Sequence, residues 1–201
     1  MEDNINYTQP VYAERPMPSL WEATKTCLTK KYATFSGRAR RSEYWWFMLA
    51  QYILNAALGI IMMISVVAIV MVKATSGSID DMSPLDFYLM NPGMWLIILI
   101  CLALLIPNLA VTVRRLHDIG RSGWWLLVPM LVCPLLLAGS IVLAIYNKDL
   151  WFFIPVAYLI TLAVSIIMIV WMATNGKKET NRWGPSPKYV PVNETNTGNN
   201  A

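Results

Sequence analysis

The residues best suited to chemistry form a polar run in the middle of the chain, between two apolar segments. Guanidinium, imidazole, carboxylate and hydroxyl groups follow one another there at Arg114, Arg115, His117, Asp118, Arg121 and Ser122. Arginine side chains bind phosphate oxygens as planar forks, and Gly120 and Gly123 let backbone N–H groups turn toward an anion. The run therefore predicts either a pocket for a phosphate-bearing headgroup or a set of charged anchors in which Asp118 pairs with an arginine.

Two other segments carry similar groups. Arg38, Arg41 and Glu43 precede the first long apolar segment, and Arg182 follows the last one. We expect Glu43 to form an ion pair, either with Arg40 or with an arginine of the central run. If Glu43 and the aspartate of the central run met on one face, the two carboxylates could act as acid and base. Nothing in the sequence brings them together, so it assigns no catalytic residue.

The sequence predicts no metal site and no cofactor. His117 is the single histidine, and Cys27, Cys101 and Cys133 are far apart in the chain. A structural zinc site needs about four ligands such as His and Cys at close spacing, which this chain lacks. We expect His117 to hydrogen-bond Asp118 or to lie at the surface, and the cysteines to pack among apolar side chains.

The elements that must position these groups are membrane-spanning helices. Of the 201 residues, 56% are hydrophobic and only 14% are charged, whereas about a quarter of an ordinary soluble domain is charged. Residues 44–72, 87–113, 122–147 and 150–176 contain no Asp, Glu, Lys or Arg. Each window can cross a hydrocarbon core about 30 Å thick, which needs roughly 20 apolar residues. The composition excludes a soluble enzyme and a secreted disulfide-rich protein, and it predicts an all-α integral membrane protein.

The pattern along the chain predicts four parts. Residues 1–18 form a flexible arm, and residues 19–34 form an amphipathic helix at the membrane interface, started by a capping box of Ser19 and Glu22. A transmembrane domain of four helices with its polar motifs covers residues 35–187, and a disordered tail covers residues 188–201. The expected spans are 46–72, 92–113, 124–146 and 150–172, the last two joined as a tight hairpin.

The distribution of positive charge predicts the orientation of the chain. Fourteen of the sixteen Lys and Arg residues lie before the first span, in a charged connection at 114–123, or after the fourth span. Lys73 and Lys148 alone fall on the opposite side. Because cytoplasmic loops retain Lys and Arg, we expect both termini in the cytoplasm. The same rule explains the formal net charge of +4 without nucleic acid as a partner.

Polar residues inside the spans are neutral. Gln51 and Asn55, four residues apart, share one face of the first span and are suited to hydrogen bonds between helices. Ala157, Thr161 and Ser165 form a face of small residues that predicts close helix packing. No Asp, Glu, Lys, Arg or His lies inside any of the four windows, which argues against a self-contained proton-coupled pump.

Three strings resemble a known family. They are FSGRARRSEYWWF at 35–47, VRRLHDIGRSGWWLL at 113–127 and NRWGPSP at 181–187. Together they resemble the bacterial family called domain of unknown function 805, over residues 21–187. Trp183 stands where we expect a tyrosine in the family's tail motif. The resemblance implies a four-span protein of the bacterial inner (plasma) membrane, and it implies no activity, because the family has no established one.

The candidate binding residues at the cytoplasmic side are called the collar below. The collar comprises Arg38, Arg41, Glu43, Arg114, Arg115, His117, Asp118, Arg121, Ser122 and Arg182. The sequence favours a non-enzymatic multi-pass protein in the lipid bilayer whose collar binds anionic lipid headgroups or a protein partner. If the collar binds a protein partner, that partner could be a second copy of this chain, forming a homo-oligomer, or another membrane protein. The alternatives are a membrane enzyme acting on a phosphate-bearing lipid and an accessory subunit of a transporter or channel.

Overall fold

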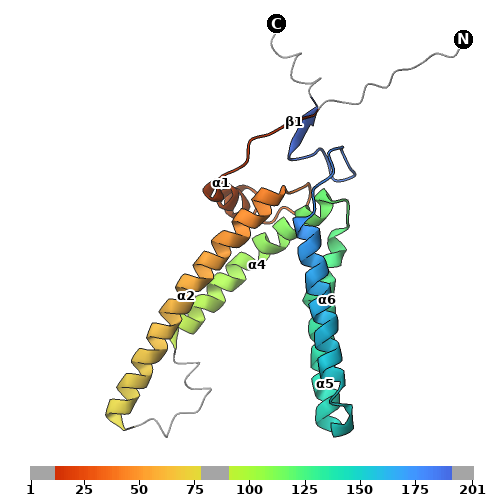
Figure 1. The fold of residues 1–201 in the computed structure, drawn as a ribbon. Coiled ribbons are helices and arrows are strands. Elements are labelled where there is room, and N and C mark those ends of the chain that lie inside the picture. The colour runs from red at the N-terminus through yellow and green to blue at the C-terminus, as the bar shows by residue number, and fades with distance from the viewer. Residues whose placement is uncertain (1–11, 78–90, 192–201) are drawn as a thin grey trace, which may run out of the picture. The chain divides into compact units, whose positions relative to one another are not determined.

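The structure, a computed structural model, describes residues 12–77 and 91–191. Within these ranges, four helical segments are long and apolar enough to cross a membrane (Figure 1). They are α2 (Arg41–Ser76), α4 (Pro92–Asp118), the segment Gly123–Tyr146 that ends in α5, and the segment Lys148–Ala173 that ends in α6. The predicted class of fold, a helical membrane protein with four spans, is confirmed.

The chain divides into two compact units that draw on separate parts of the sequence. Unit 1 consists of residues 1–18, 35–44 and 111–201, and it contains every collar residue. Unit 2 consists of residues 19–34 and 45–110. Helices α2 and α4 each contribute their collar end to unit 1 and the remainder of their length to unit 2.

Unit 2 begins with a short helix, α1 (Leu20–Lys25), which continues into a π-helical turn at Thr26–Lys30. The predicted capping box is present, because Ser19 N donates to Glu22 Oε2 at 2.9 Å and Glu22 N donates to Ser19 Oγ at 3.2 Å. Ala23 and Cys27, four residues apart, are buried, whereas Trp21 is exposed. These residues give the helix one apolar buried face, and its place at the membrane interface stays a prediction.

At the other end of unit 2, Asn91 joins the two long helices. Its Oδ1 accepts hydrogen bonds from Gly93 N and from Ser65 Oγ, each at 3.0 Å. The first bond caps the start of α4, and the second reaches α2. Buried polar groups of this kind fix the register of two helices, since each must find its partner away from water.

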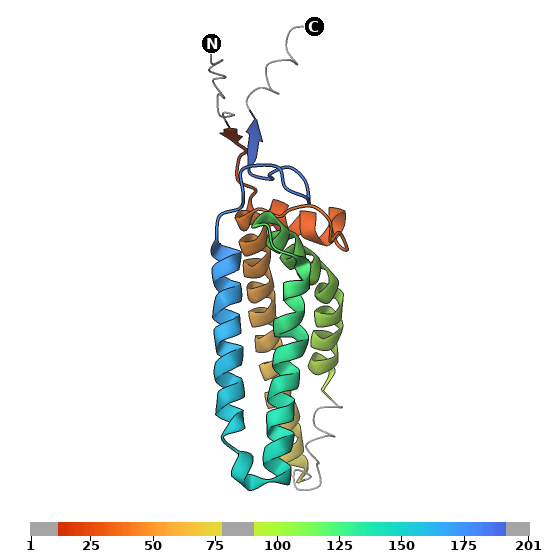
Figure 2. The same ribbon diagram turned by 90° about the vertical axis from the view of Figure 1, so that its right-hand side faces the viewer.

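Unit 1 contains the predicted hairpin of the third and fourth spans. Its first arm starts as a 3₁₀ turn (Gly123–Leu126), passes through a π-helical turn (Val128–Val132) and becomes α5 (Cys133–Tyr146). Proline lacks the N–H of a regular helix, and Pro129 lies in the π-helical turn, whereas Pro134 lies in the first turn of α5, where that N–H is not needed. After a 3₁₀ turn at Lys148–Leu150, α6 (Phe153–Ala173) packs along α5 (Figure 2).

Small residues are buried on both helices of the hairpin, among them Ala157 of the predicted face of small residues. Ala157 on α6 and Ser140 on α5 are both buried. Thr161 and Ser165 donate their hydroxyl hydrogen bonds to carbonyls of their own helix, at Ala157 and Thr161 respectively. Small side chains let two helix backbones approach closely, which increases the van der Waals contact between the helices in lipid.

The structure differs from the sequence prediction in two places. Helix α4 continues to Asp118, although residues 114–118 were expected in a connection, because their charges are neutralised by partners described below. Strand β1 (Tyr12–Glu14) pairs antiparallel with β2 (Tyr189–Pro191), where an unstructured arm and tail were expected. An ion pair of 2.9 Å between Lys188 Nζ and Glu14 Oε1 supports this pairing. Residues 1–11 and 192–201 of the predicted arm and tail lie outside the described residues.

Candidate functional site

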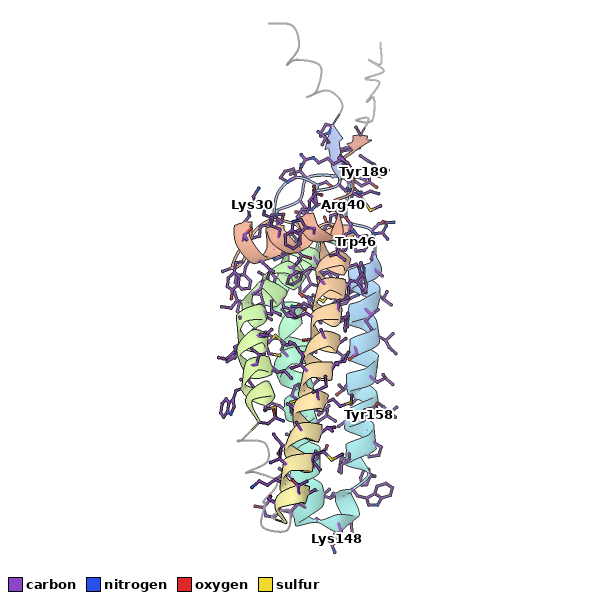
Figure 3. All side chains as sticks on the ribbon, turned by 90° about the vertical axis from the view of Figure 1, so that its left-hand side faces the viewer. Lys30, Arg40, Trp46, Lys148, Tyr158 and Tyr189 are labelled. Carbon is purple, nitrogen blue, oxygen red and sulfur yellow. The ribbon has the colours of Figure 1, made fainter. Side chains whose placement is uncertain are left out.

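Three segments that are remote in sequence meet in unit 1. Ala39 N donates to Arg114 O at 3.0 Å, which joins the segment before α2 to the end of α4. Lys177 N donates to Asp118 O at 3.1 Å, which joins the same end of α4 to the segment after α6. Figure 3 shows Arg40 and Tyr189 at this end of unit 1, and Lys148 at the opposite end. The structure therefore gathers the three strings quoted above into one site.

Burial divides the collar into two parts. The inner collar is the buried set Arg38, Glu43, Arg114, Arg115, His117 and Asp118. The outer collar is the more accessible set Arg41, Arg121, Ser122 and Arg182. The two parts differ in their partners as well as in their exposure.

Asp118 is the centre of the inner collar. Its Oδ1 accepts a hydrogen bond from Arg38 Nε at 2.9 Å, and its Oδ2 accepts one from Arg115 Nη1 at 2.5 Å. Both guanidinium groups are almost completely buried. The prediction that Asp118 pairs with an arginine is confirmed, and the carboxylate in fact serves two arginines.

Further N–H groups of Arg38 and Arg115 donate to backbone carbonyls at the end of α6 and in the segment after it. Arg38 Nη1 donates to Glu179 O at 2.8 Å, and its Nη2 donates to Lys177 O. Arg115 Nε donates to Met172 O at 3.1 Å, and its Nη2 donates to Thr174 O. These bonds hold the segment 172–179 against the end of α4 and compensate positive charge that the carboxylates alone do not neutralise.

Arg114 and Glu43 form the second buried ion pair, with 2.5 Å between Nη1 and Oε1. Glu43 was expected to pair with Arg40 or with the central run, and the structure selects the central run. Arg40 instead donates from Nη1 to the carbonyls of Arg15 and Pro16, at 2.8 and 3.0 Å. Glu43 and Asp118 thus belong to separate ion pairs, each held by arginine.

The predictions for His117 were wrong. Its Nδ1 lies 3.2 Å from Gly37 O, and its ring stacks on Trp183 with 4.4 Å between ring centroids and 11° between planes. Since a carbonyl only accepts, Nδ1 must carry a proton in this hydrogen bond. Adjacent residues of a helix point to different faces, which separates His117 from Asp118. The aromatic residue at position 183 therefore packs on the only histidine of the chain.

Sequence reasoning missed Gly176. A Cβ at this position would collide with the carboxylate of Asp118, so the backbone passes directly over the buried ion pairs. Only glycine allows this approach. A glycine three residues beyond α6 was the available signal, but the sequence does not show which group it would face.

The sequence predicted that backbone N–H groups of the Gly120–Gly123 turn bind an anion. In the structure, two N–H groups of this turn donate to carbonyls of α4. Gly120 N donates to His117 O at 3.0 Å and Arg121 N to Leu116 O at 2.9 Å, with Gly120 at φ +85°. This is the Schellman pattern that closes a helix C-terminus. Ser122 Oγ lies 3.5 Å from Trp124 N at the start of the next turn. The N–H groups of Gly120 and Arg121 are therefore used to close the end of α4.

The arginines of the outer collar lie on aromatic rings or at a helix end. Arg121 Cζ is 3.8 Å from the ring centroid of Trp171, which in turn meets Trp125 edge-to-face at 5.4 Å. Arg182 Cζ is 3.9 Å from the ring centroid of Trp183. Arg41 Nη1 donates to Ala173 O at 3.1 Å, at the end of α6. Within residues 12–77 and 91–191, none of these three arginines forms an ion pair with a carboxylate.

Comparison with known proteins identifies the family. The sequence profile described as "Protein of unknown function (DUF805)" matches residues 32–185, which include the first two strings and most of the third. The chain belongs to the DUF805 family. Among DUF805 relatives from Escherichia coli K12, Inner membrane protein YhaI is 30% identical over 161 residues, covering 80% of this chain and 91% of its own.

Two further relatives come from the same strain. Inner membrane protein YhaH is 28% identical over 162 residues, covering 81% of this chain and 93% of its own. Uncharacterized protein YiiR is 34% identical over 104 residues, covering 51% of this chain and 66% of its own. No solved structure matches the chain. This DUF805 protein is an inner-membrane protein with several membrane-spanning helices.

Proposed function

We propose that this DUF805 protein is non-enzymatic and binds anionic lipid headgroups through its outer collar, with both termini in the cytoplasm. The observation that carries the proposal is Arg121, an exposed guanidinium stacked on Trp171 at a membrane-span boundary. A stacked guanidinium keeps its edge N–H groups available for phosphate oxygens. The ion pairs of the inner collar then hold in place the segments that carry the outer collar.

The surroundings of Arg121 suit a lipid headgroup. Trp124 is 77% exposed and Trp125 is 47% exposed, and both lie at the start of the third span. Tryptophans are enriched at the level of lipid headgroups, because the indole ring is apolar while its N–H is polar. Each basic residue near an anionic membrane surface contributes about 1 kcal/mol of attraction.

The partners of the two inner carboxylates favour this function over the enzyme alternative. A general acid or base must reach a substrate proton. Glu43 and Asp118 are buried and held by three arginines in all. Both oxygens of Asp118 and Oε1 of Glu43 are engaged in these ion pairs, which supports a structural role.

The test is lipid binding by the purified protein after Arg121→Ala. In native mass spectrometry, the variant should retain less phosphatidylglycerol and cardiolipin than the wild type, with phosphatidylcholine binding unchanged. Arg121→Lys should retain an intermediate amount of anionic lipid, since lysine keeps the positive charge but lacks the planar guanidinium group that binds two oxygens at once. Lys148→Ala, at the other end of unit 1, is the matched control. Equal retention of anionic lipid by the wild type and Arg121→Ala would contradict the proposal.

Orientation is tested separately. An alkaline phosphatase fused after Lys148 should be active, because this enzyme folds outside the cytoplasm, and a fusion at the C-terminus should be inactive. A green fluorescent protein at the same two positions should give the reverse result. An active phosphatase at the C-terminus would place the collar outside and exclude a site on the cytoplasmic leaflet.

A further inference from the structure

Pro107 interrupts the hydrogen bonding of α4. It lies in the interior of the helix, eleven residues before its end at Asp118. In a regular helix, the N–H of residue 107 would donate to the carbonyl of Ala103, four residues earlier. Proline has no N–H, and its ring pushes that carbonyl aside. Pro107 therefore removes from Ala103 O the hydrogen bond that the helix would otherwise supply.

Ala103 lies in an apolar part of α4, where the membrane provides no donor. It is ten residues after the start of the apolar segment Gly93–Asp118 and fifteen residues before its end. Leu102 and Ile106, on either side of it, are 60% and 41% exposed, as side chains that face lipid are. In the hydrocarbon core, a carbonyl freed by proline must be satisfied by the protein itself.

Tyr32 supplies the missing donor. Its hydroxyl donates to Ala103 O at 2.5 Å, from a position just after α1 and the π-helical turn at Thr26–Lys30. A tyrosine side chain combines an apolar ring with a polar tip, which suits a hydrogen bond made among apolar side chains. Tyr32, Ala103 and Pro107 all belong to unit 2.

We infer that Tyr32 and Pro107 form a conformational latch, in which the Tyr32 hydroxyl replaces the N–H that Pro107 lacks and fastens residues 19–34 to α4. When the latch is closed, the carbonyl of Ala103 is paired and α4 is supported at its proline. When it opens, α4 lacks a hydrogen bond at the position where proline favours a bend. The attachment of residues 19–34 therefore controls the stiffness of α4 at Pro107. This inference does not rest on lipid binding at Arg121.

Two other prolines in the spans show why Pro107 needs this partner. Pro134 lies in the first turn of α5 and Pro155 in the first turn of α6. The N–H groups of a first turn have no partner within their helix, so proline removes no hydrogen bond there. Pro107 lies well inside α4, and the hydroxyl of Tyr32 meets the carbonyl four residues before it, which is the one that proline frees.

The experiment is a double-mutant cycle on the full chain in mild detergent, followed by thermal unfolding. Tyr32→Phe keeps the ring and removes the hydroxyl, so it should lower the melting temperature by about 2–4 °C. Pro107→Ala returns an N–H to the carbonyl of Ala103. In that background, Tyr32→Phe should therefore have little effect, which loss of ring packing alone would not explain.

Two matched variants control the cycle. Tyr52→Phe removes a hydroxyl from a side chain of α2 that is 70% exposed, and it should leave the melting temperature nearly unchanged. Pro155→Ala restores an N–H elsewhere, so Tyr32→Phe should keep its full effect beside it. If Tyr32→Phe had the same effect with Pro107 and with Pro107→Ala, or no effect in either, the inference would be overturned.

Thiol labelling gives a second reading that does not need the Pro107→Ala variant. In a chain with Cys101 and Cys133 replaced by alanine, the buried Cys27 reports whether residues 19–34 stay attached. Tyr32→Phe should raise the rate of maleimide labelling about threefold to tenfold, because loss of one hydrogen bond shifts the opening equilibrium by that factor. Tyr52→Phe should not raise it. Equal labelling rates with and without Tyr32→Phe would overturn the inference.

Discussion

The inner and outer collars use the same residue type for opposite purposes. In the inner collar, Arg115 is 0% exposed and donates to one carboxylate and two carbonyls. In the outer collar, Arg121 is exposed and rests on an aromatic ring. The comparison shows that arginines at the end of a membrane span do not all have the same role. Burial and partners decide which arginines build the protein and which are available to bind.

The charge balance of the inner collar supports this division. Arg38, Arg114 and Arg115 face only two carboxylates, and further N–H groups of Arg38 and Arg115 bond to carbonyls at the end of α6 and beyond. A buried charge is costly unless it is paired and hydrogen-bonded. Arg38 and Arg115 meet that condition through Asp118 and their backbone partners.

The largest effect is expected from Asp118→Asn. The change leaves two buried guanidinium groups without their carboxylate, which should lower the free energy of unfolding by about 3–5 kcal/mol. Thermal unfolding in detergent, followed by tryptophan fluorescence, measures the loss. Asp149→Asn, in the exposed turn before α6, is the control and should change little. Equal melting temperatures for the two variants would remove Asp118 from the centre of the inner collar.

Gly176→Ala should have the next largest effect. The added methyl group meets the Asp118 carboxylate, so the segment after α6 must move, at a cost of about 1–3 kcal/mol. Gly139→Ala is the matched control, because a Cβ there meets nothing within 4 Å and alanine favours a helix. If Gly176→Ala were as stable as Gly139→Ala, the close approach to Asp118 would be wrong.

Arg121→Ala should be nearly neutral for stability. An exposed cation–π contact contributes about 0.5–1 kcal/mol, far less than a buried ion pair. The same thermal unfolding assay measures this difference beside the lipid assay described above. If Arg121→Ala lowered the free energy of unfolding as much as Asp118→Asn, Arg121 would have a structural role and the distinction between the two collars would be wrong.

The smallest effect concerns β1 and β2. Lys188 donates a hydrogen bond to Glu14 and lowers the pKa of that exposed carboxyl. A carboxyl with a lowered pKa in the folded state stabilises the pairing above its unfolded pKa, and this contribution is lost as pH falls through the folded value. Protection of the Arg15 amide against hydrogen exchange should therefore decrease in acid. Glu14→Gln should remove this dependence, and a dependence that persisted in the variant would assign it to another group.

The sequence by itself determined the elements. Charge-free windows fix the four spans, because each hydrocarbon-length helix must be apolar, and the capping box at Ser19 fixes the start of α1. The ion pair of Glu43 with the central run could also be anticipated, since a carboxylate among arginines at one boundary has few other partners. These features depend on local composition and spacing, which are visible in one dimension.

Only the tertiary structure decided which polar residues are buried. The stacking of His117 on Trp183, the approach of Gly176 to Asp118 and the carbonyl partners of Arg38 join segments far apart in sequence. The continuation of α4 to Asp118 has the same origin, because its charges are tolerated in a helix only where those segments meet. A guanidinium is chemically identical at every position of the chain. The groups that surround it in three dimensions decide whether it holds the fold or faces a ligand.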